Sequence, residues 1–302
     1  MIVDIFSAAL AFFCEKIDKF LGILTTDITT YQGGAIWKAV STVYDAMLAI
    51  GLTIAGVLIW IQLLSSMNKY AEFRKSTVWI QFIVEIVAAN AILYYGKYIL
   101  LQCIVIGQGI AKRMMNVTGM VSADGTSIFH IVVPEQLGNA IDNMSLLKEI
   151  GVFIVVIIAS IWIVISTCGV LLSVYGRLFN LYLLIAISPL PIAAAMSKPT
   201  RFVTYNFFKS FLAVTLEALV MVLTLYLFQA FFSSGFNLKI AREDVLLTDS
   251  YFVTHMADEI GLQTASASKA VFGYIAEISF LFLMLFGMLK GTDKLVNRIF
   301  GI

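Results

Sequence analysis

Apolar residues are gathered into six long stretches, which short polar segments separate. Four of the stretches contain no charged residue, and the other two contain one glutamate each. The hydrocarbon core of a bilayer is about 30 Å thick and takes roughly 20 apolar residues of helix to cross. Because backbone N–H and C=O groups must be paired in lipid, the stretches are predicted to be transmembrane helices. They cover residues 46–68, 76–96, 150–176, 178–197, 218–238 and 270–289.

The residues between these stretches predict how the spans connect. Gln32, Gly33 and Gly34 predict a turn before the first span, whose helix can begin as early as Ile36. The residues around Arg177 interrupt the longest apolar run and predict a tight hairpin between the third and fourth spans. The predicted spans are residues 46–66, 78–95, 150–174, 178–196, 207–232 and 270–289.

The pattern therefore predicts an all-α fold, a polytopic transmembrane helical bundle of about six spans with an amphipathic N-terminal helix. That helix either lies in the membrane interface or on a partner, or folds back against its own bundle. Its charged residues, such as Glu15 and Lys16, argue against a cleavable signal peptide. Its apolar face is formed by Phe6, Leu10, Phe13, Ile17, Phe20, Leu21 and Leu24. The expected organisation is an amphipathic segment (1–35), a first helical pair (36–111), a polar loop (112–148) and a four-span core (149–302) with a second polar loop (233–269).

Composition agrees with a membrane protein and narrows the chemistry. Hydrophobic residues make up 60% of the chain and charged residues 13%, with a net charge of +1. Soluble domains carry nearer 25% charged residues, and nothing here indicates a basic surface for nucleic acid. Cys14, Cys103 and Cys168 have no disulfide or metal spacing and are interpreted as packing residues. With two histidines, His130 and His255, and no nucleotide-binding or nucleophile motif, the chain is predicted to be neither an enzyme nor a cofactor-binding or metal-binding protein.

Polar residues inside the predicted spans are the first candidates for function. Glu85, Glu217 and Glu277 lie in three different spans, and Asn90 follows Glu85 by about a turn and a half. A charge at mid-bilayer costs roughly 2.5–3.5 kcal/mol on insertion scales, so each glutamate needs a partner or water. Three roles stay open for them: structural contacts between helices, the lining of a polar path, and proton coupling.

Two prolines inside the fourth span are the second candidate. Pro189 and Pro191 each remove a helix hydrogen bond and predict a break or kink. Such a break is tolerated in a membrane where protein or water pairs the freed carbonyls. The alanines at 193–195 that follow allow close helix approach. The break is either a plain kink or a functional hinge.

The order of these features resembles a known family. A long apolar helix leads into residues 183–193, LLIAISPLPIA, then a basic turn with Lys198 and Arg201, then the aromatic-rich helix at 207–232. This resembles the TrbL family of conjugal-transfer proteins, which includes the VirB-six-like polytopic subunits of type IV secretion systems. The resemblance is best over residues 150–232 and is greatest to the versions found on conjugative elements of Gram-positive bacteria.

The resemblance implies a non-enzymatic channel subunit of the plasma membrane. Such proteins form homo-oligomeric rings and assemble with other secretion subunits, including a traffic ATPase and a coupling protein. They help to pass single-stranded DNA with its relaxase, or protein substrates. In the family a central loop faces outward and contacts partners or substrate. In this chain that loop is expected near residues 97–148, and its candidate contact residues are Ser127, Ile128, Phe129, His130 and Ile131.

Membrane orientation and one alternative function stay open. About two thirds of the 20 Lys and Arg residues fall on the side that holds both termini and the central loop, which places that side in the cytoplasm by the positive-inside rule. The family resemblance places the same loop outside. The alternative function is a secondary transporter of a small solute that uses the intramembrane glutamates. Transporters usually have helix breaks in both of two related halves, and only one break is evident in this sequence.

Overall fold

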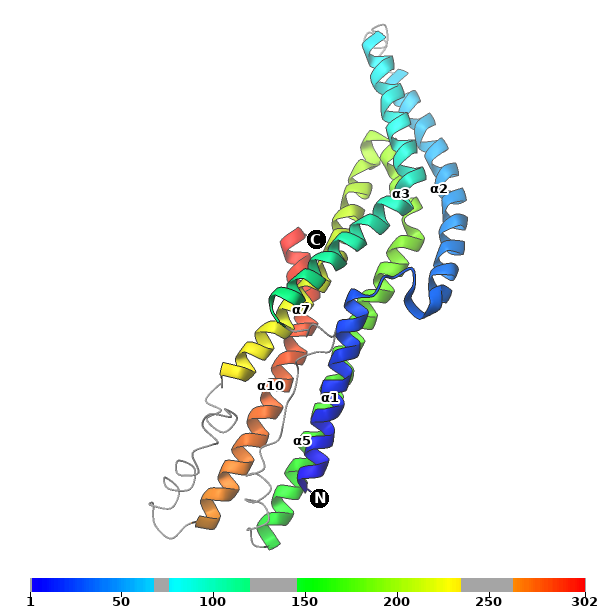
Figure 1. The fold of residues 1–302 in the computed structure, drawn as a ribbon. Coiled ribbons are helices and arrows are strands. Elements are labelled where there is room, and N and C mark those ends of the chain that lie inside the picture. Colours follow the sequence, from blue (N-terminus) through cyan, green and yellow to red (C-terminus); the bar gives the residue numbers. More distant parts are fainter. Residues whose placement is uncertain (1, 68–75, 120–145, 235–262, 302) are drawn as a thin grey trace. The chain divides into compact units, whose positions relative to one another are not determined.

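The computed structural model describes residues 2–67, 76–119, 146–234 and 263–301 (Figure 1). Over these ranges the chain is almost entirely helical and contains no strand, so the predicted all-α class is confirmed. The α-helices are α1 (Ile2–Thr25), α2 (Ala35–Met67), α3 (Ser76–Val117), α5 (Leu146–Ile187), α6 (Pro189–Ala193), α7 (Arg201–Ser234) and α10 (Gln263–Phe300). Three short 3-10 turns join them: η1 (Tyr31–Gly34), η2 (Ala194–Met196) and η3 (Lys198–Thr200).

Among the described residues, five helices are long and apolar enough to cross a membrane: α2, α3, α5, α7 and α10. The chain is thus a candidate multi-pass membrane protein. The predicted turn before the first span is confirmed, because Gln32, Gly33 and Gly34 all have positive φ. Helix α2 then begins at Ala35, one residue before the earliest start expected from the sequence.

The predicted hairpin around Arg177 is wrong. Helix α5 runs without interruption through Arg177 for 42 residues, so the third and fourth predicted spans belong to one helix. Gly176 costs the helix only about 1 kcal/mol relative to alanine, and no proline or cluster of turn-forming residues accompanies it. The Arg177 side chain, moreover, is buried and hydrogen-bonded inside the protein. An arginine between two apolar runs therefore gave a false turn signal.

The described chain divides into two compact units. The first unit comprises residues 1–23, 113–174 and 221–291, and the second comprises residues 24–112, 175–220 and 292–302. Helices α5, α7 and α10 each contribute one part to both units.

In the first unit, α1 packs against the chain's own helices. The ring of Phe13 lies 4.5 Å from that of Phe282 on α10 and 6.3 Å from that of Phe228 on α7. The ring of Phe6 contacts Tyr274 on α10. The seven apolar residues predicted to form one face of this helix are all buried. Of the two placements expected for α1, the structure shows the one in which it folds back on its own bundle.

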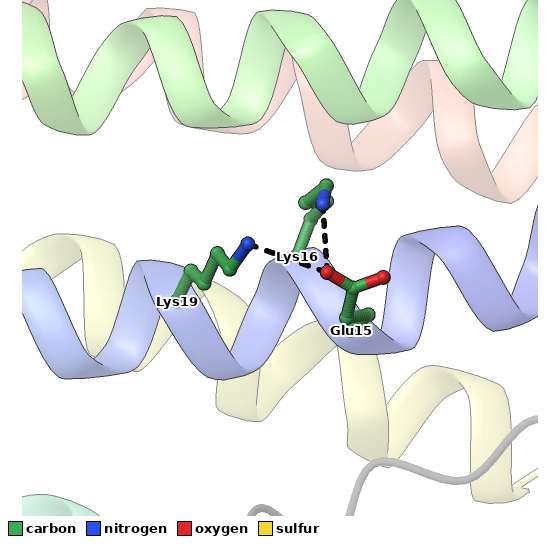
Figure 2. A network of polar contacts seen from close by, with 3 residues as sticks. All are labelled: Glu15, Lys16 and Lys19. Atoms are coloured by element: carbon green, nitrogen blue, oxygen red, sulfur yellow. Dashed lines mark hydrogen bonds and ion pairs between the residues drawn. The ribbon is translucent and has the colours of Figure 1, made fainter.

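The charged side of α1 carries a small ion network (Figure 2). One carboxylate oxygen of Glu15 lies 2.8 Å from Lys16 Nζ and 3.3 Å from Lys19 Nζ. Hydrogen bonds from these two lysines lower the pKa of Glu15 below its ordinary value, and Glu15 raises that of Lys16. The contribution of Glu15 to stability is therefore present at neutral pH and is lost as the pH falls through its lowered pKa. Exposed pairs of this kind are weak, so the packing of the aromatic face holds α1 in place.

In the second unit, α2 and α3 lie side by side and antiparallel (Figure 1). The buried positions of α2 form a narrow stripe at Tyr44, Gly51, Ala55 and Gln62. This stripe faces the segment that follows the end of α5. At Gly51 the approach is so close that a Cβ atom would lie 2.9 Å from the carbonyl oxygen of Pro189. Only glycine fits there, because the opposing atoms belong to the backbone.

Replacing Gly51 by alanine tests this packing. The added methyl group forces α2 away from Pro189, and overpacking of this kind costs about 1–3 kcal/mol. Thermal unfolding in detergent should show a clear loss of stability. The matched control is Gly56→Ala on the same helix, where nothing lies within 4 Å of the added Cβ. Equal stability of both variants would contradict the close contact.

Candidate functional site

Pro189 and Pro191, which were predicted to break or kink the fourth span, follow directly on the end of α5. Helix α5 ends at Ile187 and α6 begins at Pro189, with Ser188 between them. The backbone N–H of Ser188 donates to the carbonyl of Ile185 at 3.2 Å, and its hydroxyl donates to the same carbonyl at 2.8 Å. Ser188 is completely buried. The break is therefore a packed element of the second unit.

Threonine hydroxyls pair the carbonyl groups beyond the break. The hydroxyl of Thr204 on α7 donates to the carbonyl of Pro191 at 2.7 Å. The hydroxyl of Thr200 donates to the carbonyl of Ala194, also at 2.7 Å. These two carbonyls lie in α6 and η2, where the helix stops, and they gain side-chain donors from residues that follow. This is the arrangement that allows an irregular backbone at membrane depth.

Gln62 on α2 completes the pairing from a distant part of the sequence. Its side-chain oxygen accepts a hydrogen bond of 2.9 Å from the backbone N–H of Lys198, and the Ser197 hydroxyl lies 3.4 Å from the same oxygen. Gln62 and Ser197 are buried. Sequence reasoning missed Gln62 because it is uncharged, although an amide inside a stretch of 23 charge-free residues was a usable signal.

Arg177 forms the second polar feature of this unit. It is 3% exposed, and its Nε and Nη2 donate to the carbonyls of Val214 and Thr215 on α7, at 3.0 and 3.2 Å. A planar guanidinium suits two adjacent carbonyl acceptors, whereas a lysine ammonium does not offer the same fork. Arg177 therefore ties α5 to the middle of α7. Its position between two charge-free runs was the signal available in the sequence.

Glu217 provides the negative charge near Arg177. It is buried, and it lies near both the Arg177 guanidinium and the carboxyl group of Asp293 on α10. A hydrogen bond between two carboxyl groups needs a proton on one of them. If the pair holds one proton, the three side chains sum to zero charge, as a buried cluster requires. The cluster joins α5, α7 and α10 within the second unit.

The other predicted intramembrane residues are not among the three side chains of this cluster. Glu277 belongs to the first unit, and one of its carboxyl oxygens is buried without a hydrogen-bond partner among the described residues. Asn90 is exposed on α3. Glu85 also lies on α3, but its side chain is outside the described part of the structure. The structure therefore places Glu217 in a polar cluster and does not gather all four residues into one site.

The remaining candidates give no further site. The five loop residues at 127–131 lie outside the described residues. Within the described ranges, no group of three or more His, Cys, Asp or Glu residues is placed to hold a metal ion. Among the described residues, Cys14, Cys103 and Cys168 form no disulfide.

Comparison of the chain with models of protein families, with curated proteins and with solved structures gives no match.

The Arg177 cluster can be tested by a double-mutant cycle. Arg177→Leu removes the donor of two buried carbonyls and leaves Glu217 without its nearby cation, and each lost hydrogen bond from a charged group costs about 1.5–3 kcal/mol. Arg177→Lys should fall between the wild type and Arg177→Leu, because it keeps the charge and loses the fork. Adding Glu217→Gln to Arg177→Leu should restore part of the stability in detergent unfolding. Strictly additive losses would contradict direct coupling of the two side chains.

Proposed function

We propose that this protein is a non-enzymatic channel or scaffold subunit of a type IV secretion machine in the plasma membrane. The proposal combines the TrbL-like order of sequence features with a multi-pass helical architecture. In this role the protein assembles with copies of itself and with other secretion subunits, and helps to pass relaxase-bound single-stranded DNA or protein. The energy source is a nucleotide bound by a partner such as the traffic ATPase.

The single observation that carries the proposal is the uncovered apolar surface of α2 and α3. In the most apolar 18-residue stretch of each helix, 17% is buried in α2 and 24% in α3, compared with 56% in α7. Trp60, Val57 and Leu64 of α2 are each more than half exposed. Such faces need lipid or neighbouring subunits. A subunit of a ring can present them to both.

The polar break supports a structural role for the second unit. Its carbonyls are paired by Thr200 and Thr204, and Gln62 fixes it to α2. Fixed geometry at this point gives each subunit a defined surface for assembly. The loop at residues 127–131 is proposed to contact partners or substrate on the outer side, which rests on the family resemblance alone.

A secondary transporter is the second candidate function. Buried ionisable residues inside spans often mark substrate or ion pathways. Arg177, Glu217 and Asp293 form such a group beside a broken helix, and broken helices bind substrates in many transporters. In this role Glu217 and Asp293 bind a cation or proton that is exchanged during transport.

Transfer and transport assays separate the two functions. Deleting the coding sequence from a conjugative element that carries it should reduce transfer to recipient cells to the background level, and the wild-type chain supplied in trans should restore transfer. The protein purified in mild detergent should migrate as an assembly well above its 33.4 kDa chain mass. Normal transfer by the deletion strain, together with a monomer that takes up solutes in liposomes, would favour the transporter instead.

A further inference from the structure

Lys97 of α3 is held by three residues on one face of α2. Its Nζ lies 5.4 Å from the ring centroid of Trp37 and 5.1 Å from that of Tyr44, and it hydrogen-bonds to the hydroxyl of Ser41. The backbone N–H of Lys97 donates to the Tyr44 hydroxyl at 3.1 Å. A cation over two aromatic rings is stabilised by their electron-rich faces. These four residues form a clamp that fixes the register between α2 and α3.

The clamp aligns an apolar segment of α2 that has no charged residue with an apolar segment of α3 that contains one, Glu85. The segment of α2 begins at Ala46, just after Tyr44, and the segment of α3 ends at Gly96, just before Lys97. Since the helices are antiparallel, both segments extend from the clamp in the same direction. Residues 46–66 and 76–96 each extend about 30 Å at 1.5 Å per residue, which equals the hydrocarbon thickness of a bilayer. The chain between them contains Lys69, Arg74 and Lys75.

Exposed tyrosines surround the clamp on α3. Tyr94 is 77% exposed, Tyr95 is 60% exposed and Tyr98 is 62% exposed. The rings of Tyr94 and Tyr95 pack edge to face with centroids 5.5 Å apart. Tyrosine and tryptophan concentrate at the head-group level of membranes, where the ring meets the acyl chains and the hydroxyl reaches water. Lysine at this level reaches toward the polar layer.

We propose that Tyr94, Tyr95 and Tyr98 form a surface for the lipid head-group layer, and that the Lys97 clamp sets this layer at the middle of α3. Residues 76–96 then cross the hydrocarbon beside residues 46–66 of α2. The later part of α3, from Tyr98 to Val117, lies beyond the head groups. The occupant of the tyrosine surface is lipid, not a protein partner.

A different position of α3 in the membrane also fits the length and composition of this helix. Residues 86–117 of α3 are long and apolar enough to cross a membrane by themselves. In that register Lys97 and the three tyrosines lie within the hydrocarbon, and Ile106 lies near its centre. The observation against it is the clamp, because it holds α2 and α3 together at the same end of two apolar segments of equal length. These two segments together contain one charged residue, Glu85, whereas residues 86–117 contain three, Lys97, Lys112 and Arg113. The two registers assign opposite depths to Val87 and Ile106, both of which are exposed.

Depth measurements on spin-labelled protein distinguish the registers. Single cysteines at Val87, Tyr95 and Ile106 are introduced into the full chain with Cys14, Cys103 and Cys168 replaced by alanine, and each labelled protein is reconstituted into phosphatidylcholine–phosphatidylglycerol vesicles. Collision rates of the label with oxygen and with a water-soluble nickel chelate report its depth. Tyr94→Cys serves as a second probe at the head-group level if Tyr95→Cys does not fold.

The oxygen-to-nickel ratio should be severalfold higher at position 87 than at positions 95 and 106. A higher ratio at position 106 than at position 87 would overturn the proposed register. Labels at positions 94 and 95 that are shielded from both reagents would show a protein partner on the tyrosine surface, which also overturns the proposal. Because the experiment uses vesicles and no secretion partner, its result is independent of the proposed role in DNA transfer.

Discussion

The second unit depends on one constraint: a backbone carbonyl or N–H that leaves a helix in an apolar environment must find a partner within the protein. Pro189 and Pro191 end α5 against a part of α2 that contains no charged residue. An unpaired polar group in hydrocarbon costs several kcal/mol, so the break persists only because it is paired. Ser188 pairs the Ile185 carbonyl, which loses the N–H of residue 189 to proline. Thr204, Thr200 and Gln62 pair backbone groups of the segment that follows. The close contact at Gly51 follows from the same need, since α2 must approach the break closely for Gln62 to reach it.

The buried charged groups of the second unit also have partners within the protein. Arg177 is surrounded by two carbonyl acceptors and one nearby carboxyl group, and Glu217 has both a cation and a second carboxyl group beside it. Each charged group is thereby compensated inside one chain. Such a cluster fits a subunit whose helices must keep a fixed arrangement during assembly, and it is also the part of the molecule best suited to bind an ion. In the proposed role, the uncovered faces of α2 and α3 are the surfaces for assembly, and the buried groups preserve the form of each subunit.

Much of the fold could be predicted from the sequence because apolar length is a strong signal. The all-α class, the turn at Gly33 and the start of α2 followed from residue patterns. The hairpin at Arg177 did not exist, because a charge inside an apolar run can mark either a turn or a buried partner, and only the fold shows which. The candidate site was harder to predict. Glu217 was singled out by its charge, whereas Gln62 and Asp293 join the polar features only through contacts between helices far apart in sequence.

Hydrogen exchange at the Lys198 amide tests the central constraint most directly. The protein is reconstituted into lipid nanodiscs, and exchange is followed at single-residue level by fragmentation mass spectrometry, for the wild type and for Gln62→Leu. If Gln62 pairs this N–H inside the bundle, its exchange in the wild type is slow, and Gln62→Leu accelerates it while leaving the interior of α7 protected. Fast exchange at Lys198 in the wild type, or equal rates in the two proteins, would contradict the account.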